Sequence, residues 1–199
     1  MVPTTRPMHR TRPAFPLLAV LLAGACAGAL PEPPDPVPPP VETPPPAAPS
    51  APPAPWSGAR LPAAGVPPVY AAEWRKAGNR ATCAPLAPAS LDPYAAARPR
   101  AATFSGGWAV AYDLPDRRSA FGVAGAGVGA AGPSYSGWPH HIRWADGSTA
   151  EYGPEGGTGP NQLAYLRIPG QDCLYNVWSG LGREHLEELL GRLRFVDVR

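Results

Sequence analysis

Four polar residues between positions 140 and 148 are of the types that hydrolytic enzymes combine: His140, His141, Asp146 and Ser148. A histidine can act as the general base for a serine nucleophile, with an aspartate orienting the imidazole ring. The local pattern argues against this chemistry, because Asp146 precedes Gly147 as the first residue of an expected hairpin turn. Ser148 also lacks the strained strand-to-helix turn that exposes a catalytic serine. We therefore assign no catalytic residue.

Neither these histidines nor a nearby glycine-rich run offers a convincing metal or cofactor site. Adjacent residues of a strand point to opposite faces, so His140 and His141 cannot readily chelate one ion. The run GVGAAG, Gly127–Gly132, has the G-x-G-x-x-G spacing of a dinucleotide-binding turn. The residues that follow, PSYSGWPHH, cannot begin the helix that such a turn requires. We expect a loop or strand end there, no metal and no cofactor.

The N-terminal residues have the composition of an export signal. Residues 1–13 contain three arginines and no acidic residue, and the apolar run from Phe15 to Leu30 is closed by small residues. The run is shorter than the roughly 20 apolar residues of a membrane span, and prolines rather than basic residues follow it. These features predict a secretory signal peptide over residues 1–25.

The end of this signal, Leu22 to Cys26, resembles the lipobox of bacterial lipoproteins, in which the cysteine thiol receives a diacylglycerol and becomes the mature N-terminus. The leucine lies four residues before the cysteine, whereas the family prefers it three before. An ordinary signal peptide cut after Ala25 or Ala29 is the alternative. The resemblance implies that Cys26 is lipidated and that the protein is anchored in a bacterial cell envelope, on a periplasmic or surface-facing side.

The cysteine count adds to this interpretation. The chain has three cysteines, and an odd number in an exported protein leaves one outside any intramolecular disulfide. If Cys26 carries lipid, Cys83 and Cys173 remain as a pair, and an oxidising compartment favours a disulfide between them. The chain-entropy model gives roughly 4–5 kcal/mol for closing a loop of this length.

The net charge argues against nucleic acid as a partner. The chain has 17 basic and 15 acidic residues, and three of the arginines lie in the expected signal peptide. Without them, 14 basic residues stand against 15 acidic ones, a net charge of −1. Such a surface has no long-range attraction for phosphates or anionic headgroups. We expect no nucleic acid partner, and membrane contact through the lipid anchor.

Proline dominates the segment after the signal. From Pro31 to Pro55 the chain reads PEPPDPVPPPVETPPPAAPSAPPAP, and because proline fixes φ and lacks an amide donor, we expect polyproline II. At about 3.1 Å per residue the segment reaches roughly 80 Å when extended. Residues 26–65 are thus expected to form a lipidated N-terminus and disordered stalk, followed by a folded domain over residues 66–199.

Hydrophobic periodicity predicts an α+β fold for that domain. Leucines at 186, 189, 190 and 193 form one apolar stripe on a helix after Gly182. A shorter helix is expected within residues 67–79. Alternation predicts strands over residues 104–112, 120–123, 140–152, 162–168 and 172–178. We expect a mostly antiparallel sheet of about five or six strands, one disulfide, and the C-terminal amphipathic helix packed on one face.

Two of these strands allow more detailed predictions, one of a hairpin register and one of helix packing. A two-residue turn at Asp146 and Gly147 would place Ile142 opposite Glu151. In the strand over residues 104–112, one face carries bulky side chains and the other small ones. The small face would allow a helix to approach the backbone closely.

Aromatic residues suggest a binding surface. Tyr135 and Trp138 lie in a loop rich in glycine and proline, and Trp144 follows on the next alternating run. Trp and Tyr combine a large flat face with a polar group, which suits carbohydrate or peptide recognition. The alternative is that these rings fill the core of a small β-rich domain.

These features together predict an envelope lipoprotein that displays a small noncatalytic binding or assembly domain. Its expected partners are the membrane, through the lipid anchor, and either a cell-wall glycan or an envelope protein. The alternative is an extracytoplasmic hydrolase with unassigned catalytic residues.

Overall fold

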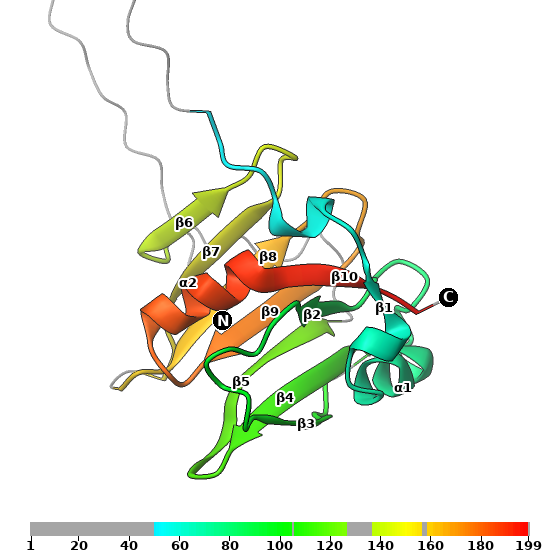
Figure 1. Cartoon of the computed structure of the whole chain (residues 1–199). Helices are drawn as coiled ribbons and strands as arrows, with labels where there is room; N and C mark the ends of the chain where they lie inside the picture. Colours follow the sequence, from blue (N-terminus) through cyan, green and yellow to red (C-terminus); the bar gives the residue numbers. More distant parts are fainter. Residues whose placement is uncertain (1–49, 105, 127–136, 157–158, 199) are drawn as a thin grey trace, which may run out of the picture. The chain divides into compact units, whose positions relative to one another are not determined.

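An antiparallel sheet of seven strands forms the centre of the fold (Figure 1). The computed structural model describes residues 50–104, 106–126, 137–156 and 159–198. They belong to the unit that spans Ala47–Arg199. The sheet order is β3-β4-β5-β9-β8-β7-β6. Its strands are β3 Arg98–Ala101, β4 Trp108–Leu114, β5 Arg117–Ala126, β6 His140–Arg143, β7 Thr149–Pro154, β8 Gln162–Arg167 and β9 Leu174–Ser179.

The expected α+β fold is confirmed, with more strands than the sequence predicts. The alternation in β4 holds: Trp108, Val110 and Tyr112 are fully buried and share one face of the sheet. Their partners on β5 include Phe121 and Val123, which are also buried. We call this the core face, and the opposite side the second face.

The C-terminal helix α2, Arg183–Arg192, packs on the core face as expected (Figure 1). Its apolar stripe places Leu186, Leu189 and Leu190 in the core, and each is at most 4% exposed. Burying one leucine side chain contributes roughly 1.5–3 kcal/mol, so this stripe is enough to hold a ten-residue helix. Within the described ranges, no helix is long and apolar enough to cross a membrane.

A second sheet lies beside α2 and was not predicted. It has the order β1-β10-β2, with bounds β1 Leu61–Pro62, β2 Leu86–Pro88 and β10 Leu193–Asp197. Strand β10 follows α2 directly and pairs parallel with β1 and antiparallel with β2. Helix α1, Val69–Lys76, completes this layer, and its Tyr70 hydroxyl contacts the Tyr112 hydroxyl of β4 at 3.0 Å.

The folded unit includes residues that the sequence analysis assigns to the stalk. Ala54 and Trp56 are 5% and 4% exposed, and the Trp56 ring packs edge-on against Trp144 at 4.8 Å. Leu61 pairs with Val196 in the three-stranded sheet. The expected boundary at residue 66 is therefore too late. The prolines in this segment indicate a disordered stalk, but Trp56 packs on Trp144 and Leu61 pairs with Val196, and both partners lie far along the chain.

The hairpin register differs by one residue from the expected one. Ile142 lies opposite Ala150, and His141 lies opposite Glu151. The turn has three residues: the Gly147 amide donates to the Trp144 carbonyl at 3.0 Å, and Gly147 has a φ of 86°. This is a type I turn followed by a bulge, which needs glycine at the left-handed position. The observed register pairs Ile142 with Ala150 on the core face and leaves Glu151 on the second face. In the expected register, the charged Glu151 would share the core face with Ile142, which would be unfavourable.

The disulfide between Cys83 and Cys173 is confirmed. The sulfur atoms are 2.11 Å apart, and both cysteines are at most 1% exposed. The bond joins positions separated by 90 residues, the loop before β2 and the residue before β9. Cys26 lies outside the described residues.

We expect opposite effects from alanine at two glycines. A Cβ at Gly125 would collide with the Cys83 sulfur and would lie 2.6 Å from Trp108 Nε1, whereas Gly191 on α2 has nothing within 4 Å. Gly125→Ala should lower the free energy of unfolding by about 1–3 kcal/mol. Gly191→Ala should raise it by about 0.5–1 kcal/mol, because glycine costs entropy in a helix.

Urea denaturation of the two variants and the wild type measures both effects. The Gly191→Ala variant is the matched control for adding a methyl group. A Gly125→Ala protein as stable as the wild type would contradict the close packing around the disulfide.

Candidate functional site

The two adjacent histidines of β6 lie on different faces, as expected. His140 packs against Tyr152 at 5.1 Å, and its Nε2 lies 3.4 Å from the Arg183 guanidinium. Tyr152 donates to Glu187 at 2.8 Å, and burial together with that hydrogen bond raises the pKa of Tyr152 to about 12. His141 is exposed on the second face. Through these contacts, His140 on β6 and Tyr152 on β7 connect the edge of the sheet to α2.

Asp146 and Ser148 bind a tryptophan rather than a histidine. Trp56 Nε1 donates to the Asp146 carboxylate at 2.9 Å and lies 3.2 Å from Ser148 Oγ. Burial alone raises the pKa of Asp146, but the hydrogen bonds from Ser148 and Trp56 outweigh it and hold the pKa below its usual value. Ser148 is fully buried. The hairpin tip thus anchors the N-terminal segment, and no triad forms there.

The three aromatic residues that were expected to form a binding surface do not lie together in the described structure. Trp144 is 6% exposed and packs with Trp56, so it belongs to the core and its assignment to a binding surface is wrong. Trp138 is half-buried, and its ring lies 5.0 Å from Tyr165. Tyr135 lies outside the described residues. Sequence pattern could not separate these roles, because Trp56, the partner of Trp144, lies 88 residues away.

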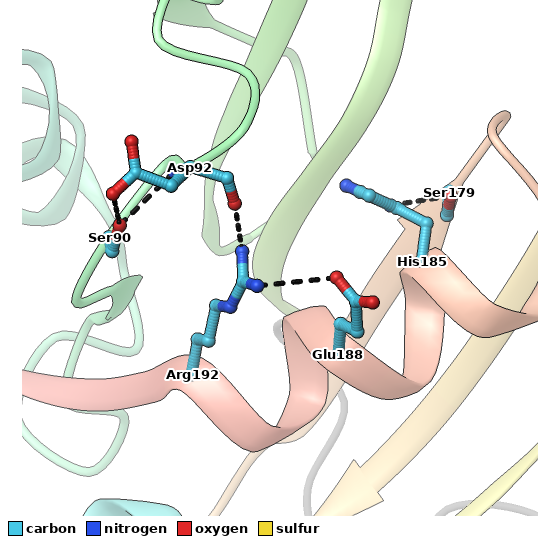
Figure 2. A network of polar contacts seen from close by, with 6 residues as sticks. All are labelled: Ser90, Asp92, Ser179, His185, Glu188 and Arg192. Atoms are coloured by element: carbon cyan, nitrogen blue, oxygen red, sulfur yellow. Dashed lines mark hydrogen bonds and ion pairs between the residues drawn. The ribbon is translucent and has the colours of Figure 1, made fainter.

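A serine and a histidine that the sequence analysis missed lie together at the end of β9 (Figure 2). Ser179 Oγ and His185 Nδ1 are 2.8 Å apart, and the Leu181 amide donates to the same oxygen at 3.0 Å. Ser179 is 1% exposed and His185 9% exposed. The two residues match no nucleophile motif, and the available signal was a histidine on the apolar stripe of α2.

The surroundings of this pair suit structure better than catalysis. Tyr94 and Phe121 each pack 4.9 Å from the His185 ring, beside a cavity of only ≈ 10 Å³. That space holds about one water molecule. Figure 2 shows Glu188 turned to Arg192, at 3.3 Å, so this carboxylate does not orient the imidazole. The pair ties the end of β9 to the start of α2.

Arg192 extends the same network to the loop after β2 (Figure 2). Its guanidinium also donates to the Asp92 carbonyl, while Ser90 donates to the Asp92 carboxylate at 2.8 Å. The network therefore closes the loop over α2. The contacts of Arg192 hold the loop in place, and they bring no general base to a serine hydroxyl.

The second face carries a different group of side chains. Strand pairing places Trp178 opposite Gly122 on one side and Leu163 on the other, and Asn176 opposite Tyr165. Among the described residues, neither helix lies on this face. The half-buried side chains on this face, Leu163, Tyr165 and Trp178, belong to the strands β8 and β9.

Trp178 lies directly on the backbone of the neighbouring strand. A Cβ at Gly122 would overlap the six-membered ring of Trp178, and would also lie 2.6 Å from the Val110 carbonyl. The absence of a side chain at Gly122 thus lets the indole lie against the sheet. Trp178 is half-buried, so part of the ring remains available to a ligand.

A cavity of ≈ 420 Å³ lies beside this indole. Phe104, Leu163 and Trp178 supply apolar walls, and Thr103, Glu155 and Asn176 supply polar groups. A neighbouring cavity of ≈ 300 Å³ shares Glu155 and Trp178 and adds Arg118, Asn161 and Gln162. A mostly apolar hollow with a few polar groups is the usual form of a ligand site.

Asn176 is the unusual member of this cavity. The residue is only 7% exposed, and its side chain lines the cavity. In the described part of the chain, the buried side-chain atoms without a hydrogen-bond partner lie elsewhere, at Asn79 Oδ1 and Trp108 Nε1. The Asn176 amide therefore borders the open cavity, where a ligand can pair with its donors and its acceptor.

A third cavity lacks this feature. It has a volume of ≈ 210 Å³ and is lined in part by Arg60, Arg80 and Gln171. Gln171 Oε1 already accepts from the Ala84 amide at 2.8 Å, and Arg60 stacks over Phe195 at 4.9 Å. Its polar groups are therefore used within the protein.

The described residues contain no group of three or more histidine, cysteine, aspartate or glutamate side chains that could hold a metal ion. The cysteines at 83 and 173 are bonded, so neither provides a thiolate. Comparisons with protein-family models, with curated proteins and with solved structures found no match for this chain.

The buried imidazole predicts a pH dependence of stability. Burial lowers the pKa of His185 below its usual value of 6.5; nearby Glu188 opposes this shift and Arg192 adds to it. Once the pH falls below 6.5, the unfolded chain binds more protons than the folded one, so stability decreases. The full contribution of the neutral ring is present above that pH.

Denaturation at a series of pH values between about 8 and 5 tests this prediction. The free energy of unfolding of the wild type should fall relative to that of His185→Gln as the pH decreases. His141→Gln removes an exposed imidazole and serves as the control. A constant difference between wild type and His185→Gln would contradict the assignment.

Proposed function

We propose that this chain is an envelope-anchored lipoprotein that displays a noncatalytic binding domain on a proline-rich stalk. The disulfide supports the proposal, because it pairs Cys83 with Cys173 and leaves Cys26 outside this bond. A disulfide is compatible with an oxidising, extracytoplasmic compartment. Lipidation of Cys26 would account for the third cysteine and would supply the contact with a membrane.

One observation carries the binding function: the Asn176 side chain, in a residue only 7% exposed, lines an open cavity beside the half-buried Trp178 indole. A binding domain explains both features, since a ligand would stack on the ring and pair with the amide. The alternative, an extracytoplasmic hydrolase, would use Ser179 and His185. Their burial, and the ≈ 10 Å³ cavity beside the imidazole, favour binding over hydrolysis.

Expression of the full precursor in a bacterium that processes lipoproteins tests the anchor. The wild type should partition into the detergent phase and have the N-terminal mass of a lipidated Cys26. Cys26→Ala should partition into the aqueous phase or remain unprocessed. A Cys83→Ala/Cys173→Ala double variant, which removes the other two cysteines, should still partition with detergent. An unlipidated mature protein with Cys26 in a disulfide would overturn the proposal.

Retention of envelope material on the immobilised mature chain tests the binding function. Peptidoglycan and solubilised envelope extract should yield a component that the wild type retains and that Trp178→Leu loses, because leucine cannot replace the flat indole. Phe195→Leu, on the remote strand β10, should retain it. Generic ester and peptide substrates are assayed in parallel. Turnover of a substrate without retention of any component would favour the hydrolase.

A further inference from the structure

We infer that the cavity beside Trp178 binds a neutral oligosaccharide that contains an N-acetylated sugar. This inference rests on the proposed binding function and names its ligand class. It begins with the shape of the site: cavities of ≈ 420 and ≈ 300 Å³ share Trp178 and Glu155, which gives two adjoining hollows along one indole. Adjoining hollows suit a chain of sugar rings better than a single small molecule.

The indole supplies a platform for a sugar ring. Trp178 lies against Gly122, where a Cβ would overlap its ring, so the sheet supports one side of the indole. The apolar C–H groups on one face of a pyranose can pack on such an aromatic surface. Leu163 and Phe104, the latter 37% exposed, extend this apolar surface.

The amide of Asn176 determines the kind of sugar. An asparagine side chain has both a carbonyl acceptor and two N–H donors. The acetamido group of an N-acetylated sugar offers the complementary N–H and carbonyl. Asn176 is 93% buried, since its exposure is 7%, and its side chain lines the cavity. An acetamido group would satisfy this amide, with its methyl group against Leu163 or Phe104.

The other polar groups suit hydroxyls and a ligand without net charge. Glu155 is exposed and lines both cavities, so its carboxylate can accept hydrogen bonds from sugar hydroxyls. Thr103 can donate or accept. The two adjoining cavities carry one charge of each sign, Glu155 and Arg118, so a ligand of either charge meets a like charge, which favours a neutral saccharide.

The proline-rich segment of this chain is the main competing occupant, because prolines also pack on aromatic grooves. Residues 31–49 precede the described part of the folded unit. Eleven of these 19 residues are proline and lack an amide donor, so the segment offers fewer donors to the Asn176 carbonyl and to Glu155 than a saccharide does. A saccharide has donors for both acceptors.

Calorimetric titration of the mature chain tests the inference with two probes. One is a tetramer of β-1,4-linked N-acetylglucosamine, and the other is the β-1,4-linked glucose tetramer, which lacks the acetamido groups. The first should bind, and the second should bind at least about tenfold more weakly, the loss expected for about 1.4 kcal/mol of hydrogen bonding.

Two variants locate the site. Asn176→Ala should weaken binding of the N-acetylglucosamine tetramer by about tenfold. The Asn176 side chain borders the cavity on the second face, away from the packed core, so the protein should remain folded, which a thermal melt verifies. Trp178→Leu should reduce binding below detection, whereas Phe195→Leu should leave it unchanged.

Several results would overturn the inference. These are no binding of the N-acetylglucosamine tetramer, equal binding of both tetramers, or unchanged binding by a folded Asn176→Ala protein. Trp178-dependent binding of a synthetic peptide of residues 31–49, without binding of the tetramer, would assign the cavity to the stalk. If the tetramer fails but an envelope component is retained in a Trp178-dependent way, the saccharide inference fails and the proposed function remains.

Discussion

The structure depends on the bond between Cys83 and Cys173, because it joins the layer over the core face to the central strand β9. Backbone and side-chain hydrogen bonds reinforce the same junction: the Asp172 amide donates to the Thr82 carbonyl at 2.9 Å, and Tyr175 donates to the Ala84 carbonyl at 2.8 Å. The junction lies next to β2, which pairs with β10, and β10 directly follows α2 in the chain. One covalent link therefore ties this layer to the central strand of the sheet.

This cover explains why the two faces of the sheet differ in chemistry. On the core face, polar groups that resemble catalytic ones pair with each other, as in the Ser179–His185 and Tyr70–Tyr112 contacts. Such pairs hold elements together because their partners are inside the protein. On the second face, Asn176 lines an open cavity. A polar group that borders an open cavity can pair with a ligand, and this contrast locates the candidate site.

The elements that the sequence predicts correctly are those with a regular period. Alternation identified the strands around Val110 and Val177, and the leucine stripe identified α2. The short strands β1, β2 and β10 were missed because two of them contain proline and all three depend on partners distant in sequence. The candidate site was missed for a related reason. Trp178 and Asn176 acquire a common face with Leu163 only after the strand order is known.

The small residues of the second face have a different role from the expected one. The small face of the strand over residues 104–112 predicts close approach of a helix, yet both described helices lie on the core face; the small surface continues on β5 at Gly122, opposite Ala111. The group that approaches is the indole of Trp178, and a single methyl group at position 122 would displace it. Gly122 contributes nothing to a ligand directly, but it fixes the height of the ring above the sheet. The depth of the cavity beside Asn176 follows from that height, so a backbone position on β5 shapes a site whose polar group lies on β9.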